Sequence, residues 1–571
     1  MENLDQFAPP FEAHAYTAED KRLISAFFTN LDKSAYVPLI FAPELIGALS
    51  SRASRAPEDL RKIFLNEYIL PFVEPERDPK ETDVEWQERV RYGQELEEFI
   101  AFLQGHPITT VFSNPRARAF YIKWLAQYGD DSIAQMAGAH LVFSGLSQVA
   151  IKHLEDQRIG LAPIEKSTRY VNYGAKINGQ YMYYTDPTLR ELGLEGEYRA
   201  AMDGLFDAYR RLIPKLTEWL KNKFPEEKTS VVEKKAFDTL RGLLPVATLS
   251  QVAFFGNGQA FEYMISRSAR HPLGEIRWAA EAAYRELAEI IPAFLRRIKD
   301  PERLTETDAY QTYLARKGER TARFTEMLGI QPFSADNARV QLAEYDPEGE
   351  IKVITGILFT ADKTHASWEA CRDHAQSMSP AEKREVMDAY LAGRTARWQK
   401  VGRAFENAFV RFDIMMNIGA WRDLHRHRMH TQMRQLLTCA HGYDVPPEIS
   451  DAGLEQEYRA AIAPAEAIYA RIAETDAQLA QYAVTLAHRV RFMQWQNLRE
   501  CFWEMELRTI PEGHPDYRHI EIEKFRLLER IYPLIAERMM VNTGEYDFAR
   551  RGQEEKIQEK LRKMESAQTQ T

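Results

Sequence analysis

The sequence has few cysteines and no long apolar run. Three cysteines occur among 571 residues, and their spacing forms no Cys-x-x-Cys pair. They cannot build a disulfide framework, which indicates a reducing compartment, the cytoplasm. No apolar run approaches the length that spans a bilayer, and the acidic N-terminus lacks the apolar core of a secretion signal. We therefore expect a cytoplasmic protein without a membrane partner.

An excess of basic charge is also missing. Acidic residues outnumber basic ones by 84 to 74, so the formal net charge is −10. This balance does not attract nucleic acid, and any anion site must be a local basic cluster. The composition, with 45% hydrophobic and 28% charged residues, is that of an ordinary globular protein. The length allows at least two domains.

Most of the chain has the apolar spacing of helices. Apolar residues recur at intervals of three and four in residues 197–220, 277–298, 381–404 and 455–486. Strand patterns are few, and the clearest is VQLAEY at residues 340–345, which runs into a turn. We therefore expect a mostly helical α+β protein.

A charged and weakly patterned segment divides the chain. Residues 301–337 end in a stretch that contains Pro332, Ser334 and Asp336, and we predict a linker there. The first domain then covers residues 1–300, including an N-terminal extension, and the second covers residues 338–550. Residues 551–571 are charged and poor in apolar residues, so we expect a tail.

The two sides of the predicted linker repeat one order of elements. Each has an apolar helix, a basic loop, a long helical stretch and a helix that opens with asparagine. On the first side these contain SGLSQVAIKHLEDQR, IGLAPIEKSTRY, DTLRGLLPVAT and NGQAFEYMISR. On the second side they contain IMMNIGAWRDLHRHR, MHTQMRQLLTC, AQYAVTLAHRV and NLRECFWEMELR. Copies of roughly 200 residues indicate a duplicated domain, because solenoid repeats are far shorter.

The motifs in these copies resemble the signature of flavin-dependent thymidylate synthases. Arg426-His427-Arg428 resembles the triplet that opens the signature, and Glu165-Lys166-Ser167-Thr168-Arg169-Tyr170 resembles its later Glu-x-Ser-x-Arg-Tyr part. Neither copy keeps the whole. The first copy has Asp156-Gln157-Arg158 in place of the triplet and a loop one residue longer, and the second loses the Glu and the Ser.

Further family motifs are divided between the copies. The family's Arg-x-x-Leu-Pro is present in the first copy from Arg241 to Pro245, whereas the second has Gln481 at that place. The Asn-x-Arg…Leu-Arg helix is complete in the second copy as Asn497, Arg499, Leu507 and Arg508. In the first copy it is one residue short, with Asn257, Gln259 and Arg267. The early Glu-His pair is changed in both copies, to Gln135-Met136 and Glu406-Asn407, and the opening strand has a clear match only at residues 340–347.

The resemblance implies a fold and an activity. It implies two tandem domains of the thymidylate-synthase-complementing type, each a small mixed sheet flanked by long helices. The implied reaction is reductive methylation of dUMP to dTMP, with FAD as cofactor and methylenetetrahydrofolate and NADPH as co-substrates. The family is tetrameric, so a fused chain is expected to form a homodimer that imitates the tetramer. Composite sites would join unlike copies, and about half of the tetramer-like positions would be functional.

The resemblance also implies roles for single residues. Forked guanidinium groups suit a nucleotide phosphate, and cations near a flavin ring stabilise its reduced anion. The residues expected to bind the nucleotide are Glu165, Ser167, Arg169, Arg241 and Arg267. Those expected to bind the flavin are Arg426, His427, Arg428, Asn497, Arg499 and Arg158. Arg267 and Arg508 are expected to be catalytic by polarising the pyrimidine carbonyls.

Other interpretations remain open. The segment HRHRMH at residues 425–430 has the composition of a metal site, but two interleaved arginines repel a divalent cation, so we expect no metal. The chain could instead be a flavin enzyme for another pyrimidine nucleotide, or a non-catalytic scaffold that binds a nucleotide or flavin. A yellow protein would favour an enzyme over the scaffold. Nucleic-acid binding rests only on RDLHRHRMHTQMRQ, and the acidic remainder of the chain opposes it.

Overall fold

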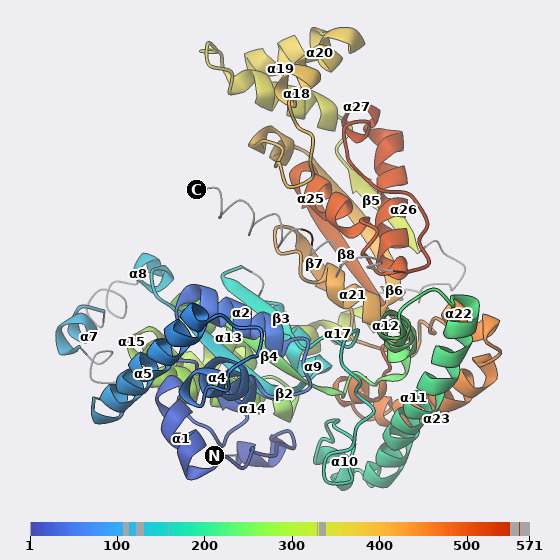
Figure 1. Cartoon of the computed structure of the whole chain (residues 1–571). Helices are drawn as coiled ribbons and strands as arrows, with labels where there is room; N and C mark the ends of the chain where they lie inside the picture. The colour runs from blue at the N-terminus through green and yellow to red at the C-terminus, as the bar shows by residue number, and fades with distance from the viewer. Residues whose placement is uncertain are drawn as a thin grey trace. The chain divides into compact units, whose positions relative to one another are not determined.

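The computed structural model describes residues 2–106, 114–121, 131–157, 159–327, 329, 339–548 and 559. This part of the chain is mostly helical and contains two four-stranded sheets, drawn in Figure 1. The chain forms two compact units. Unit 1 comprises Met1–Leu216, Phe237–Pro332 and Ile449–Thr485, and unit 2 comprises Thr217–Ala236, Phe333–Glu448 and Leu486–Thr571. The expected mostly helical α+β class with two sheet-containing domains is confirmed.

The sheet of unit 1 has the strand order β1-β2-β4-β3. Its strands are β1 (Ala35–Tyr36), β2 (Gly138–Ser147), β3 (Leu161–Glu165) and β4 (Leu249–Asn257). Every neighbouring pair is antiparallel. The expected mixed sheet is therefore corrected to an antiparallel one. The two-residue strand β1 is the opening strand that the sequence pattern did not reveal in the first copy. It is too short to show an alternating pattern.

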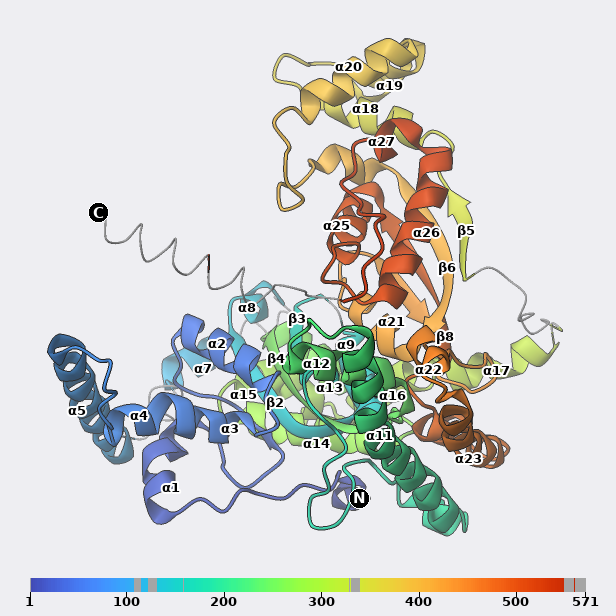
Figure 2. The same cartoon turned by 45° about the vertical axis from the view of Figure 1, so that its right-hand side comes forward.

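Both faces of this sheet are buried. Helices α13 (Gly258–Ser268) and α14 (Gly274–Ala288) lie against β4 and β2, as Figure 2 also shows. On the other face, Val142 of β2 and Ala253 of β4 belong to a core made mainly by the N-terminal extension. The extension therefore completes the first domain by covering the second face of its sheet.

The extension and the rest of the first copy are helical. The extension contains η1 (Leu4–Phe7), α1 (Ala18–Ile24), η2 (Ser25–Phe27), α2 (Pro43–Ala53), α3 (Leu60–Ile63), the π-helix η3 (Phe64–Ile69), α4 (Leu70–Val73) and α5 (Asp83–Gly105). The following helices before β4 are α7 (Pro115–Tyr121), α8 (Asp131–Gln135), α9 (Gln148–Glu155), α10 (Thr188–Glu191), α11 (Glu195–Lys223), α12 (Thr229–Leu240) and η5 (Arg241–Leu243). After α14 come α15 (Pro292–Leu295), η6 (Arg296–Lys299), α16 (Leu304–Ala315) and α17 (Lys317–Met327).

The sheet of unit 2 repeats the arrangement with the order β5-β6-β8-β7. Its strands are β5 (Val340–Tyr345), β6 (Phe409–Asn417), β7 (Thr431–Arg434) and β8 (Arg489–Asn497), and all pairs are antiparallel. Helices α25 (Leu498–Arg508) and α26 (Pro515–Ile531) lie against the sheet (Figures 1 and 2). Buried and less buried residues alternate along β6 and β8, whereas β2 and β4 are buried along most of their length, so one face of this sheet is less covered than in unit 1.

The remaining elements of the second copy are short or peripheral to its sheet. They are α18 (Gly349–Phe359), α19 (Trp368–Ser377), α20 (Pro380–Tyr390), η7 (Arg403–Asn407), α21 (Ile418–Leu424), α22 (Pro447–Asp451), α23 (Glu455–Ala473), α24 (Ala477–Ala480), η8 (Gln481–Ala483) and α27 (Pro533–Ala536). No described helix is both long and apolar enough to cross a bilayer.

The expected helices form with shorter bounds in several places. Residues 197–220 lie inside α11, whereas helix within 381–404 ends with α20 at Tyr390. The chain leaves that helix just before Gly393, which has a φ of +79° that glycine adopts readily. Helices α16 and α17 lie inside the predicted linker, part of which falls outside the described residues. The predicted domain boundaries remain predictions.

Unit 1 includes a segment of the second copy. Helix α23 lies beside α11 in both views, and Glu457 of α23 accepts hydrogen bonds from Arg211 and Lys215. Near η5 and η8, the backbone N–H of Val246 donates to the carbonyl of Val484 at 2.8 Å. These contacts place Gln481, the first residue of η8, in the same local structure as Arg241, the first residue of η5.

A buried carboxyl anchors this segment. Glu275 has no exposed surface, and it accepts hydrogen bonds from the Ser147 N–H at 2.8 Å, the Ser147 hydroxyl at 2.6 Å and the Tyr482 hydroxyl at 2.8 Å. Burial raises the pKa of Glu275 from its ordinary value of 4.5 to about 7, although the hydrogen bonds from Ser147 oppose the rise. The folded chain therefore holds a proton here that the unfolded chain releases.

We expect this proton to make the stability of unit 1 depend on pH. Because the folded pKa of Glu275 lies above the unfolded value, its contribution is full below about pH 4.5 and is lost as the pH rises through about 7. The loss amounts to about 3 kcal/mol. This loss of unfolding free energy is measured by urea unfolding at several pH values, with hydrogen exchange of the η8 backbone as the local probe. The Glu275→Gln variant should lack this component, and parallel pH profiles for the two proteins would contradict the prediction.

Candidate functional site

The two copies place one asparagine at the same strand-to-helix junction. Asn257 ends β4 and accepts a hydrogen bond from the Ala260 N–H at 2.8 Å, and Asn497 ends β8 and accepts one from the Glu500 N–H at 2.9 Å. These are N-caps, which satisfy a donor in the first helical turn. This bond fixes the side-chain oxygen of Asn497 on the helix, and the amide nitrogen is the side-chain donor for a ligand.

The helices that follow have equal lengths. Helices α13 and α25 contain 11 residues each, and β4 and β8 contain 9 each. The shorter spacing from Asn257 to Arg267 in the first copy is therefore not caused by a shorter helix. Ser268 ends α13 where Arg508 ends α25, so Arg267 lies one position earlier on its helix. One position on a helix turns a side chain by about 100°, which sends the two arginines to different neighbours.

Arg267 points to the end of another helix. Its guanidinium donates to the carbonyl of His153, and also to that of Leu154 at 3.4 Å, both in the last turn of α9. A cation at a helix C-terminus interacts favourably with the helix dipole. The structure therefore shows a capping role for Arg267, while its predicted contacts with a nucleotide remain a prediction.

Arg508 instead contacts the predicted flavin triplet. Its Nε donates to Nε2 of His427 at 2.8 Å, and Nδ1 of His427 lies 3.0 Å from Glu500 Oε1. An arginine can only donate, so Nε2 is the acceptor and Nδ1 carries the proton. Burial raises the pKa of Glu500, although the imidazole of His430, 3.9 Å away, opposes the rise. The result is a neutral His427 held in one tautomer between a cation and a carboxyl group.

The triplet alternates between buried and exposed side chains. His425, His427 and His430 are buried, whereas Arg426 and Arg428 are exposed. The segment follows α21 without regular helix, which allows this alternation. Histidines thus build the support of the segment, and the two arginines are on its accessible side. In the first copy the corresponding triplet is Asp156-Gln157-Arg158, and its predicted flavin residue, Arg158, lies outside the described residues.

A cavity of about 360 Å³ opens at the start of α25. Its wall includes both predicted flavin residues at this strand-to-helix junction, Asn497 and Arg499, together with Met429 and Trp503. Arg499 forms an ion pair with Glu406 at 2.6 Å. Three further cations line it, namely Arg394, Arg397 and Lys400. Glu406, Glu500 and Glu506 line the cavity too, and Arg394 is bound to Glu506 at 2.5 Å. The cations without such a partner among the described residues, Arg397 and Lys400, and the ring of Trp503 are the groups that the cavity offers to an anionic ligand with a flat ring.

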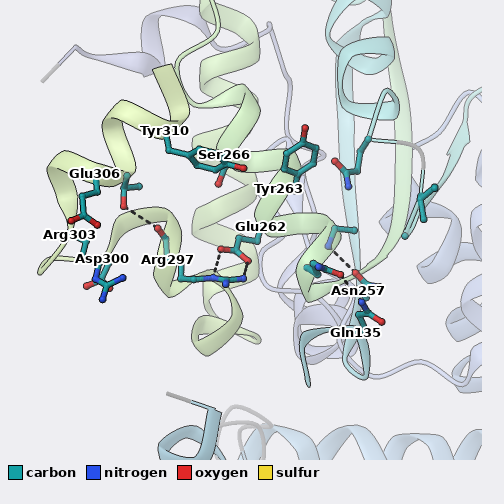
Figure 3. A pocket seen from close by; sticks show the side chains of 16 residues that line it. Gln135, Asn257, Glu262, Tyr263, Ser266, Arg297, Asp300, Arg303, Glu306 and Tyr310 are labelled. Atoms are coloured by element: carbon teal, nitrogen blue, oxygen red, sulfur yellow. Dashed lines mark hydrogen bonds and ion pairs between the residues drawn. The ribbon is translucent and has the colours of Figure 1, made fainter. Parts of the chain in front are cut away.

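A cavity of about 800 Å³ lies at the matching place in the first copy, at the start of α13. Figure 3 shows its lining. Gln259 stands where the second copy has Arg499, and its Oε1 accepts a hydrogen bond from Gln135 at 2.9 Å. Arg297 points toward Glu262 in the close-up and is bound to it at 2.7 Å. The two cavities are thus related by the repeat, but the first has replaced an Arg–Glu pair by two amides.

The predicted nucleotide residues of the first copy meet around Asp238. Arg169 Nε donates to Asp238 Oδ2 at 2.9 Å, and Arg241 Nη1 lies 3.4 Å from Oδ1 of the same carboxylate. Both arginines are buried. Ser167 is tied to this group, because its hydroxyl accepts a hydrogen bond from the Arg169 N–H at 3.2 Å. The structure therefore brings Ser167, Arg169 and Arg241 together.

Glu165 lies on the inner side of the same loop. It is buried and forms an ion pair with Lys152 of α9, which also binds Glu155 at 2.6 Å. Sequence reasoning missed Lys152 and Asp238. Asp238 lies three residues before Arg241 at the end of α12, a helical spacing that could have suggested the pair. Nothing in the local sequence marks Lys152 as the partner of Glu165.

A fully buried charge cluster lies near His427 in unit 2. The sequence did not reveal this cluster either. Lys524 of α26 donates to Gln494 at 2.8 Å and to Glu504 and Glu521 at 2.9 Å each. Burial acts against ionisation, but the ammonium of Lys524 brings the pKa of Glu504 below its ordinary value. Burial and the charge of Glu504 raise the pKa of Glu521. One cation, one anion and one protonated carboxyl then leave no net buried charge.

Comparisons with known proteins cover almost the whole chain. The family model described as thymidylate synthase complementing protein matches residues 77–293 and 343–534. A UPF0159 protein of Chlamydia pneumoniae is 33% identical over 527 residues, which are 91% of this chain and 93% of that protein. The UPF0159 protein Ta1429 of Thermoplasma acidophilum is 31% identical over 474 residues, covering 76% of this chain and 91% of its own.

Shorter proteins match part of the chain. A flavin-dependent thymidylate synthase of Mycobacterium sp. (strain JLS) is 28% identical over 247 residues, which are 42% of this chain and 90% of that protein. Among solved structures, the UMP/dUMP methylase PolB from Streptomyces cacaoi, bound with 5-Br dUMP, is 15% identical with a TM-score of 0.27. It covers 35% of this chain and 92% of its own. The sequence matches, rather than this low score, carry the assignment.

Proposed function

Because the chain belongs to the thymidylate synthase complementing protein family, we propose that it is a flavin enzyme that converts dUMP to dTMP by reductive methylation. The resemblance drawn from its motifs is confirmed at the level of the family, with one match in each copy. The observation that carries the proposal is the cavity at Asn497 and Arg499, beside the neutral His427. The similarity to the flavin-dependent thymidylate synthase of Mycobacterium sp. supports a flavin as cofactor and thymidylate as product.

The residues of the second copy fit a flavin. The cavity at the start of α25 has cations for phosphates and for an electron-rich ring, and Trp503 for stacking. The chemistry that a bound flavin supplies is hydride transfer to the pyrimidine. Asn497 would donate to the ring through its amide nitrogen, and Arg499 would add positive charge. His427 would orient Arg508, whose guanidinium would stabilise charge on the pyrimidine carbonyls.

The residues of the first copy fit the nucleotide. Arg169 and Arg241 present two guanidinium groups around one carboxylate, and Ser167 adds a hydroxyl. Fork-shaped donors of this kind bind phosphate in a bidentate manner. We therefore propose that nucleotide and flavin residues from unlike copies combine in a homodimer. Methylenetetrahydrofolate and NADPH are the co-substrates of this proposal.

We expect one flavin per chain, bound by the second copy. The matching cavity of the first copy has Gln259 and Gln135 where the second has Arg499 and Glu406, so it lacks this cation. Absorbance of the purified protein, with flavin released and quantified, gives the ratio. Arg499→Ala should lower flavin affinity at least tenfold, since a charge-assisted contact is worth about 1.5–3 kcal/mol.

A matched control comes from the first copy. Gln259→Ala changes the equivalent position of α13 and should leave the flavin content unchanged. Two flavins per chain, or an equal effect of both substitutions, would contradict the assignment to the second copy. A colourless protein that binds no added FAD would support the non-catalytic scaffold instead.

The reaction itself is tested with labelled nucleotide. Release of tritium from [5-³H]dUMP, dependent on methylenetetrahydrofolate and NADPH, is the expected result. A flavin-containing protein that releases no tritium from dUMP would instead support another pyrimidine nucleotide as substrate.

A further inference from the structure

The N-terminal extension contacts the loop that is predicted to bind the nucleotide. The backbone N–H of Ser167 donates to the carbonyl of Ser54 at 2.8 Å. The ammonium of Lys166 donates to the carbonyls of Pro57 and Glu58 at 2.8 and 3.0 Å. The segment between α2 and α3 therefore holds the backbone of the loop on one side.

This segment carries an exposed arginine at the same loop. The guanidinium carbon of Arg55 lies 5.8 Å from the ring centroid of Tyr170. Among the ion pairs of the described residues, none involves Arg55, whereas Arg52 on the preceding helix is bound to Glu67 at 2.8 Å. The acid nearest along the segment is the exposed Glu58, which forms no ion pair with Arg55 among the described residues, and the next acid, Asp59, is bound to Arg61 at 2.9 Å. Arg55 thus presents its charge to solvent beside the loop.

The charges around the loop fall short of what a nucleotide phosphate needs. Arg169 and Arg241 share Asp238, so these three groups carry one net positive charge. The buried ammonium of Lys166 is engaged by the carbonyls of Pro57 and Glu58, so it is directed to the extension and not to a ligand. A phosphate monoester carries a charge of about −1.5 to −2 near pH 7. One more cation would balance it, and Arg55 is the exposed cation that the extension places next to Tyr170.

We propose that Arg55 is a further phosphate-binding residue, and that the N-terminal extension thereby completes the nucleotide site. The inference rests on the proposed function, since it takes residues 165–170 as the nucleotide loop. Arg55 lies before residue 77, where the family match begins, so the family motifs do not assign it. The extension accordingly has two roles, covering the sheet and supplying a substrate contact.

The test compares dUMP with deoxyuridine, which lacks the phosphate. Titration calorimetry on the full chain with each ligand gives the affinities for wild type, Arg55→Ala and Arg52→Ala. We expect Arg55→Ala to weaken dUMP binding about 10- to 100-fold, the range for a charge-assisted hydrogen bond. Deoxyuridine binding should stay the same, and Arg52→Ala should change neither. The dUMP affinity of Arg55→Ala should also depend less on salt.

The outcomes separate this inference from the proposed function. A wild-type protein that binds neither ligand would remove the nucleotide site itself. If wild type binds dUMP and Arg55→Ala binds it equally well, the phosphate role of Arg55 is overturned while the nucleotide site stands. Equal weakening for dUMP and deoxyuridine would also overturn that role, because it would mean a disturbed loop. Arg55→Lys, which keeps the charge, should recover part of the dUMP affinity.

Discussion

Replacing Lys524 by methionine is expected to destabilise unit 2 by about 3–5 kcal/mol, the usual effect of removing one partner of a buried ion pair. Lys524 has no exposed surface and is the cation that faces Glu504 and Glu521. Without it, Glu504 must be buried as an uncompensated anion or must take up a proton. Both alternatives disfavour the folded state at neutral pH.

Hydrogen exchange in β8 and α25 measures this loss locally, which suits a chain of two units. Lys352→Met provides a matched control in the same unit, because Lys352 forms an ion pair with Asp346 at 2.5 Å but is 34% exposed. Its loss should amount to less than about 1 kcal/mol. Adding Glu504→Gln to Lys524→Met should recover part of the stability. Equal effects of the two lysine substitutions would contradict the account of the buried cluster.

Replacing Arg508 by methionine is expected to reduce kcat for tritium release about 10²- to 10³-fold, the range for losing one donor that stabilises a developing oxyanion. The substitution removes the donor that fixes the tautomer of His427 and the cation proposed for the pyrimidine carbonyls. Bound flavin should remain, since Arg508 does not line the cavity at the start of α25. The readouts are kcat, KM for dUMP and flavin content.

Arg267→Met is the informative comparison for this substitution. Sequence reasoning gave Arg267 and Arg508 the same role, but Arg267 caps the carbonyls of α9. We expect its replacement to speed hydrogen exchange at the end of α9 and to reduce kcat less than Arg508→Met. A loss of kcat as large as that of Arg508→Met, with α9 unchanged, would favour the catalytic role for both.

The candidate site residues could be named from the sequence because their motifs are continuous in the chain. Residues 426–428 form one continuous motif and residues 165–170 form another, so the chemical groups of each are visible without a structure. The position of Arg267 could not be predicted. Only the equal lengths of α13 and α25 show that it stands one residue before the place of Arg508. The sequence shows that the spacing between Asn257 and Arg267 is one residue shorter. It does not show whether the difference lies in a loop or in the helix.

The partners of the predicted residues were also hidden. Asp238, which joins Arg169 to Arg241, lies 69 residues from Arg169 along the chain. Lys524 and Glu504 are 20 residues apart on two different helices. Such pairs form because packing excludes water and leaves charged groups with no other partner. Side-chain spacing within a single element carries no information about pairs that join different elements.

The amino-acid sequence by itself determined the duplication, the mostly helical class and the division of family motifs between the copies. These properties depend on local spacing and on the order of residues, which are fixed along the chain. The tertiary structure decided which charges meet, which arginine caps a helix and which segment covers the first sheet. Those outcomes depend on distance between remote residues, because Coulomb interaction, hydrogen bonding and burial act through space.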